Sequence, residues 1–80
     1  MESGIMYDSK QIVSRIKFQA KRKGVTLGEM LTECGLGINT IGKMGRGCDI
    51  LTHNFAKIAD YLDCSVDYLL GRTDNPDINR

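Results

Sequence analysis

The sequence predicts an all-α fold, a compact bundle of five short helices. Along most of the chain, apolar residues recur at intervals of three and four, which is the spacing of one helix face. Serine, threonine and aspartate precede these periodic segments and glycines follow them, as helix caps do. No alternating run of β-branched residues indicates a strand. A fold without a sheet is therefore expected.

The 80 residues suffice for one small domain. The chain is 41% hydrophobic and 26% charged with a single proline, which excludes a disordered or proline-rich spacer. Its size also excludes a large multidomain enzyme. We expect an N-terminal arm over 1–8, a folded domain over 9–71 and a flexible C-terminal tail over 72–80.

The first helix is predicted over 9–23. Asp8 or Ser9 caps its start, and Gly24 ends it. Its apolar face consists of Ile12, Val13, Ile16 and Ala20.

The second helix begins with the capping box Thr26–Glu29, in which the threonine hydroxyl and the glutamate carboxylate bind backbone amides at the helix start. Gly35 ends this helix after about two turns. Its apolar positions follow the spacing of one face and are Leu27, Met30, Leu31 and Cys34.

A short third helix is predicted over 38–44, with Gly37 at its cap and Ile41 and Met44 buried. Gly45 and Gly47 close it. The fourth helix follows a Thr52 cap, and its apolar face consists of Phe55, Ile58, Ala59 and Leu62. The fifth, over 66–70, lies between a Ser65 cap and Gly71.

The segment 26–47 combines a capped helix, a glycine turn and a second short helix. Asn39, Thr40 and Lys43 lie on the face of that second helix opposite Ile41. This order predicts a helix-turn-helix, whose second helix enters a major groove about 12 Å wide. A plain helical hairpin inside a bundle is the alternative.

The net charge of +1 hides an uneven distribution. Residues 10–46 carry eight basic side chains against Glu29 and Glu33, whereas 47–80 carry three against six aspartates. The first half therefore suits a polyanion and the second would be repelled by it.

Three other kinds of site are not supported. Gly37–Lys43 matches the start of a phosphate-binding loop, but Met44 replaces its hydroxyl residue and no strand precedes it. His53 and Cys48 supply too few ligands for a metal site. A catalytic Cys–His dyad is not supported either, because the sequence supplies no third residue to orient it. We expect no enzymatic activity and no cofactor.

The three cysteines, Cys34, Cys48 and Cys64, form no CxxC pair, so reduced and mostly buried thiols are expected. Neither a membrane-spanning run nor a secretory signal is evident, which predicts a cytoplasmic location.

The chain resembles the phage-repressor and Cro-like helix-turn-helix family of bacterial and phage regulators over about residues 10–71. The resemblance is carried by Arg15-Ile16-Lys17, Gly24-Val25-Thr26, Glu29-Met30, Gly35-Leu36, Asn39-Thr40-Ile41, Arg46-Gly47, Ile58-Ala59-Asp60-Tyr61-Leu62 and Ser65-Val66-Asp67-Tyr68-Leu69-Leu70-Gly71. It implies a five-helix transcriptional regulator, a repressor, that binds a palindromic double-stranded operator as a homodimer.

The resemblance also implies site residues. Base-reading positions fall on Ile38, Asn39 and Lys43, although Ile38 could instead contact the second helix. Asparagine can bind adenine, lysine can reach guanine and isoleucine can touch a thymine methyl. Phosphate-binding positions fall on Thr26, Leu27, Thr40, Arg46 and Gly47. Among them, the Thr26, Leu27 and Gly47 backbone amides are expected to point at an anion.

The acidic half should point away from DNA and supplies the dimer candidates Tyr61, Tyr68, Leu70 and Arg72. Alternatively these side chains complete the core or lie exposed.

The chain departs from the family pattern at three positions. Leu27 replaces a common glutamine, and Ala20 and Gly45 replace an arginine and a glutamate that pair beneath the third helix. The change at Leu27 keeps a second interpretation open, an antitoxin-like protein-interaction module with weak or no base readout.

Overall fold

The computed structural model describes residues 8–48 and 50–75, and this part of the chain forms five α-helices and no strand. The predicted all-α bundle is thereby confirmed. The predicted arm, except Asp8, and residues 76–80 of the predicted tail lie outside the described residues. The helices are α1 (Ser9–Lys23), α2 (Leu27–Glu33), α3 (Thr40–Gly45), α4 (Thr52–Tyr61) and α5 (Val66–Leu70).

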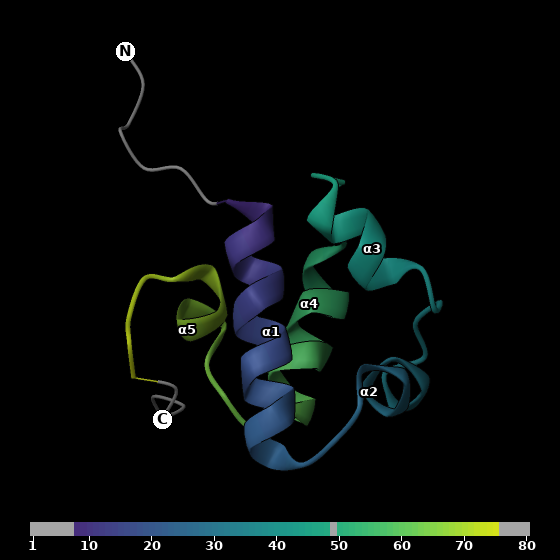
Figure 1. Ribbon diagram of the computed structural model, residues 1–80, viewed down its shortest axis with the longest axis horizontal. Helices are drawn as coiled ribbons and strands as arrows, with labels where there is room; N and C mark the ends of the chain where they lie inside the picture. The colour runs from purple at the N-terminus through teal and green to yellow at the C-terminus, as the bar shows by residue number, and fades with distance from the viewer. Residues whose placement is uncertain (1–7, 49, 76–80) are drawn as a thin grey trace.

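The long helix α1 is the centre of the arrangement (Figure 1). It packs against α2, α3 and α5, and α4 packs against α2 and α5. In Figure 1, α5 lies on one side of α1 while α2 and α3 lie on the other. The two ends of α1 form as predicted: the Asp8 carboxylate accepts from the Lys10 amide at 2.9 Å, and Gly24 is left-handed with φ 75°.

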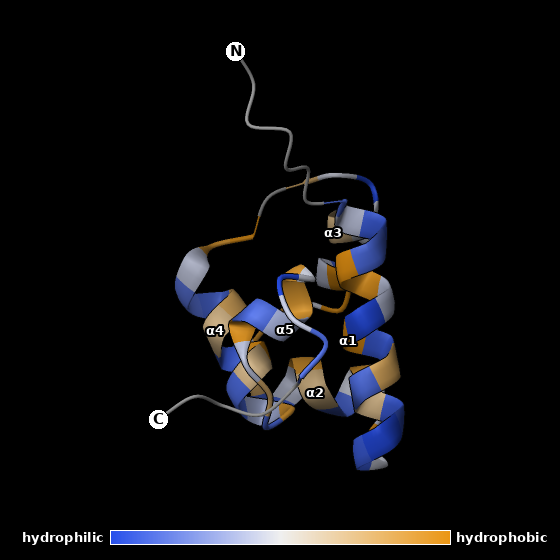
Figure 2. Cartoon of the chain, turned by 90° about the vertical axis from the view of Figure 1, so that its left-hand side faces the viewer, coloured by the Kyte–Doolittle hydropathy of each residue, from blue (hydrophilic) through white to orange (hydrophobic). Residues whose placement is uncertain are grey.

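One apolar core joins all five helices. Hydrophobic segments gather between the helices, while much of α1 is hydrophilic (Figure 2). The side chains buried most completely are Ile16, Met30, Ile58, Leu62, Leu69 and Cys64. Gln19 is the buried polar side chain of the described residues, and its Nε2 donates to the Leu62 carbonyl at 3.2 Å, which ties α1 to the end of α4.

The start of α3 differs from the predicted boundary at Ile38. Both the amide and the hydroxyl of Thr40 bind the Gly37 carbonyl, at 3.1 and 2.7 Å. These bonds close a turn over 37–40, so the helix begins only at Thr40 and its cap is Asn39, not Gly37. At its other end α3 includes Gly45, and Arg46 is the C-cap.

The start of α4 also needs a correction. The sequence predicts Thr52 as the cap, but the structure places Leu51 there and makes Thr52 the first helical residue. Leucine has no side-chain acceptor, so no side-chain cap forms. By contrast Thr26 and Ser65 cap α2 and α5 as predicted, through bonds of 3.0 Å to the amides of Glu29 and Tyr68.

None of the described helices combines the length and the apolar character needed to cross a membrane.

Candidate nucleic-acid interface

Helix α3 has one buried and one exposed face. Ile41 and Met44 are buried in the core. Asn39, Gly42, Lys43 and Arg46 follow the i, i+3, i+4, i+7 spacing and are all exposed. We call these four residues the α3 outer face. The structure therefore brings together the predicted base-reading positions Asn39 and Lys43.

Arg46 belongs to this face, although it is the C-cap of the helix. A Cβ added at Gly42 would lie 3.6 Å from Arg46 Nη1, so the guanidinium lies back over Gly42. Gly42 has no positive φ, and that distance is ordinary van der Waals contact. Neither backbone conformation nor crowding therefore requires glycine at this position.

Within the described part of the chain, both cations of the α3 outer face are exposed and outside any ion pair. Among the described residues the ion pairs are Lys23–Asp63 at 3.4 Å and Arg72–Asp67 at 3.8 Å, and neither Lys43 nor Arg46 takes part. A cation outside an ion pair can bind a phosphate without first breaking an internal ion pair.

Ile38 lies in the turn just before α3 and is 82% exposed. The alternative in which this side chain packs on the second helix is therefore wrong. The exposure leaves the side chain open to solvent at the start of α3.

Two of the predicted phosphate positions are engaged inside the molecule. The Thr40 hydroxyl donates to the Gly37 carbonyl at 2.7 Å, and the Gly47 amide donates to the Met44 carbonyl at 3.0 Å. The Gly47 amide is therefore not free to point at an anion, contrary to expectation. Gly47 adopts φ 92°, a left-handed conformation in which the chain turns away from the end of α3.

The start of α2 carries a carboxylate of its own. The Thr26 amide donates to Glu29 Oε1 at 3.0 Å, so the expectation that this amide is free is wrong. This hydrogen bond from the Thr26 backbone, together with one from the Thr26 side chain, lowers the pKa of Glu29 below its usual value. Leu27 is half-buried, and a phosphate approaching its amide would meet the negative charge of Glu29.

A hollow between α3 and α4 adds residues that sequence reasoning missed. Thr40 and Lys43 share this hollow with Leu51 and Asn54. Leu51 is 64% exposed, although leucine usually lies inside. The pair Ile50-Leu51 before a helix start was the only signal in the sequence, and it does not distinguish an exposed leucine from a core residue.

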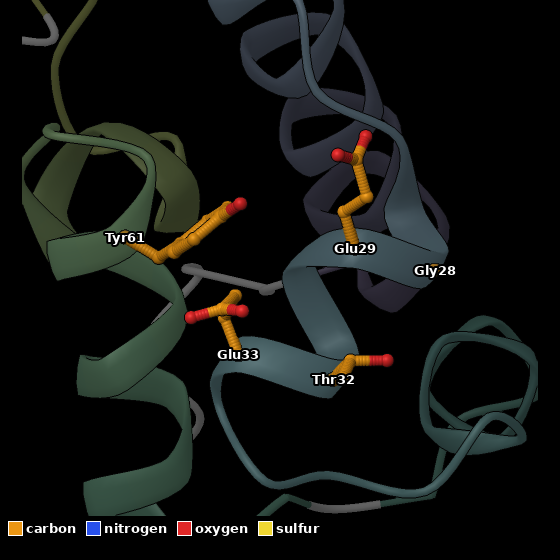
Figure 3. A pocket seen from close by; sticks show the side chains of 5 residues that line it. All are labelled: Gly28, Glu29, Thr32, Glu33 and Tyr61. Atoms are coloured by element: carbon orange, nitrogen blue, oxygen red, sulfur yellow. The ribbon is translucent and has the colours of Figure 1, made fainter.

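The dimer candidates do not form one surface. Tyr61 lines a hollow against α2 with Glu29 and Glu33 (Figure 3), whereas Leu70 lines a different groove beside Ile12. Partial burial and the nearby carboxylates raise the pKa of Tyr61.

The other two dimer candidates have separate roles. Tyr68 is half-buried against the core, and Arg72 is exposed and bonded to Asp67. The alternative that these side chains complete the core or lie exposed therefore holds: Tyr61, Tyr68 and Leu70 pack against the core, and Arg72 is exposed.

The thiols and the single histidine form no metal centre in the described part. No group of three potential ligands occurs there. Cys34 and Cys64 are buried, as predicted for most thiols, whereas Cys48 and His53 are exposed.

Comparisons of the chain with protein-family models, with curated proteins and with solved structures gave no match. The candidate interface is therefore defined by the exposure, spacing and charge of the α3 outer face.

Proposed function

We propose that this chain is a non-enzymatic transcriptional regulator that binds duplex operator DNA through α3. In this proposal α2 and α3 form a helix-turn-helix, α3 lies in the major groove, and the protein represses transcription by occupying the site. One observation carries the proposal: Asn39, Lys43 and Arg46 share one exposed face, which buried Ile41 and Met44 anchor to the core.

The residues have distinct roles in this proposal. The Asn39 amide makes a bidentate contact with adenine, and the Lys43 ammonium binds the acceptors of guanine. Ile38 touches a thymine methyl. Arg46, at the far end of the face, binds phosphate and so positions the helix without reading a base.

Few contacts from α2 are available to assist. Because Glu29 holds the Thr26 amide, the phosphate contact proposed at this helix start depends on the Leu27 amide. Electrostatic affinity therefore comes mainly from basic side chains. A homodimer on a palindromic site would double their number, and tight specific binding by so small a domain needs that gain.

Selection of bound sequences from random duplex DNA tests this function. The proposal expects a defined site, for which Asn39→Ala loses about 1–3 kcal/mol of binding free energy while its affinity for a scrambled duplex stays unchanged. Lys57→Ala is the matched control, because Lys57 is an exposed cation on α4 outside the α3 outer face. Equal losses for Asn39→Ala on both duplexes would reject base reading by α3.

A second function is favoured by the carboxylate at the start of α2. Glu29 opposes a phosphate there, and Ile38 exposes an apolar surface, as a protein-interaction or antitoxin-like module on this scaffold would. Such a module would bind duplex DNA weakly and without a defined sequence, so the same selection distinguishes the two functions.

A further inference from the structure

The outer surface of α1 presents an aromatic ring to solvent. Phe18 is 56% exposed, and the Arg22 guanidinium stacks on it at 5.9 Å from the ring centroid. Gln11, Ser14, Arg15 and Phe18 line a shallow, open hollow beside the ring. A single exposed apolar side chain is ordinary, but a ring that borders a hollow offers a place for another side chain.

These residues form a continuous stripe along the helix. Gln11, Arg15, Phe18 and Arg22 follow at intervals of four, three and four, with Ser14 between the first two. We call the five residues the α1 stripe. Phe18 lies almost opposite Ile16, which is fully buried, so the stripe faces away from the core. A helix commonly presents this spacing to a second helix.

The charge of α1 restricts what can bind the stripe. The helix carries no carboxylate, and Lys23 is its one ion-paired cation among the described residues. Two copies pairing through their stripes would bring Arg15 and Arg22 of each chain together, which is repulsive. A partner that carries carboxylates is attracted, and the Arg22 guanidinium, which donates one hydrogen bond to Gln19 Oε1 at 3.3 Å, has further N–H donors for a carboxylate.

The stripe is separate from the α3 outer face. Arg15 lies against Gly71 at the end of α5, so the stripe borders the α5 side of α1. Figure 1 shows α3 on the opposite side of α1. A molecule bound to α3 would therefore leave the stripe open.

We propose that the α1 stripe is a docking surface for an acidic amphipathic helix of another protein. An apolar side chain of that helix fills the hollow beside Phe18, and flanking carboxylates bind Arg15 and Arg22. This inference does not depend on DNA binding by α3.

The probe for this surface is a synthetic helical peptide with leucines along one face and glutamates beside them. Titration into the ¹⁵N-labelled full chain should shift amide signals of residues 11–22 and leave those of α3 in place. Phe18→Ala and Arg22→Glu should each weaken binding at least about tenfold. A peptide with lysine in place of glutamate should not bind.

Lys21→Glu is the matched control, because it makes the same charge change one residue from Arg22 and outside the stripe. The proposal expects it to weaken binding by no more than about threefold. Phe18 is exposed, so Phe18→Ala should leave the circular dichroism and thermal midpoint unchanged.

Four results would overturn the proposal. The first two are no binding at about 1 mM peptide and full binding by Phe18→Ala. The third is equal weakening by Lys21→Glu and Arg22→Glu. The fourth is displacement of the peptide by random-sequence duplex DNA that shifts the same amide signals of α1. The last result would make the stripe a nucleic-acid contact.

Discussion

The guanidinium of Arg15 lies directly against the backbone of Gly71. A Cβ added at Gly71 would lie 2.7 Å from Arg15 Cζ, and Gly71 adopts φ 86° as the left-handed C-cap of α5. The contact joins the middle of α1 to the end of the last helix. Glycine is therefore favoured at position 71 by both the backbone angle and the space available.

Gly71→Ala should lower the free energy of unfolding by about 1–2 kcal/mol, because a left-handed alanine is strained. The Arg15 tip can move, so adding Arg15→Ala should recover only a minor part of the loss. Urea unfolding of the single and double variants measures both quantities. Gly37→Ala is the control, since Gly37 has no positive φ and a Cβ there meets nothing within 4 Å. An equal loss for the control would remove the conformational explanation.

Thr26→Ala should destabilise the fold by about 1 kcal/mol, because the α2 capping box loses its hydroxyl acceptor. Thr26→Ser keeps the acceptor and should behave nearly as the wild type does. Denaturant unfolding at neutral pH compares the three chains. If the serine and alanine variants lose the same stability, the hydroxyl is not the stabilising group.

The capping box should also depend on pH through Glu29. Its pKa is lower in the folded chain than in the unfolded chain, so its contribution is present above the usual value of 4.5 and disappears as the pH falls through the folded value. The stability difference between the wild type and Glu29→Ala should therefore shrink in acid. A difference that stays constant from neutral pH to pH about 3 would contradict this linkage.

The thiols should differ sharply in reactivity. Burial raises the pKa of Cys64 to about 11 and also raises the pKa of Cys34, whereas Cys48 is exposed. A disulfide reagent should therefore modify Cys48 at once and the other two only on unfolding. Because the folded pKa of Cys64 lies above its ordinary value of 9.0, stability should fall as the pH rises from 9.0 toward 11. Cys64→Ala should show a smaller alkaline decrease, because Cys34 still contributes to it. Rapid modification of all three thiols in the folded chain would contradict the burial.

The fold was largely predictable from the sequence, because most helix ends are fixed locally. Asp8, the Thr26 box and Ser65 each bind an amide within three residues. The start of α3 was not predictable, since the Thr40 hydroxyl bonds back to Gly37 and delays the helix. The predicted start of α4 was wrong, because Thr52 is the first residue of the helix and does not cap it.

The candidate site was predicted only in part. Spacing alone placed Asn39 and Lys43 on one face opposite Ile41. It did not reveal that the Arg46 side chain lies back over Gly42, or that internal bonds occupy the Thr26 and Gly47 amides. Those features depend on side-chain conformation and on turn geometry, which periodicity does not encode.

Two chains should bind one operator, with half-sites about one helical turn (34–36 Å) apart. Sedimentation of the full chain with a selected duplex measures this stoichiometry. A single chain per duplex, at saturating protein, would reject the dimer.

The most direct measurement of the central claim is the salt dependence of duplex binding by the wild type and by Arg46→Ala. If the α3 outer face meets DNA, the logarithm of the affinity falls linearly with the logarithm of the salt concentration. The slope for the variant should then be shallower by about 1 for each phosphate that Arg46 neutralises. Lys57→Ala should keep the slope of the wild type. A flat wild-type response, or equal slopes for Arg46→Ala and the wild type, would contradict DNA binding through α3.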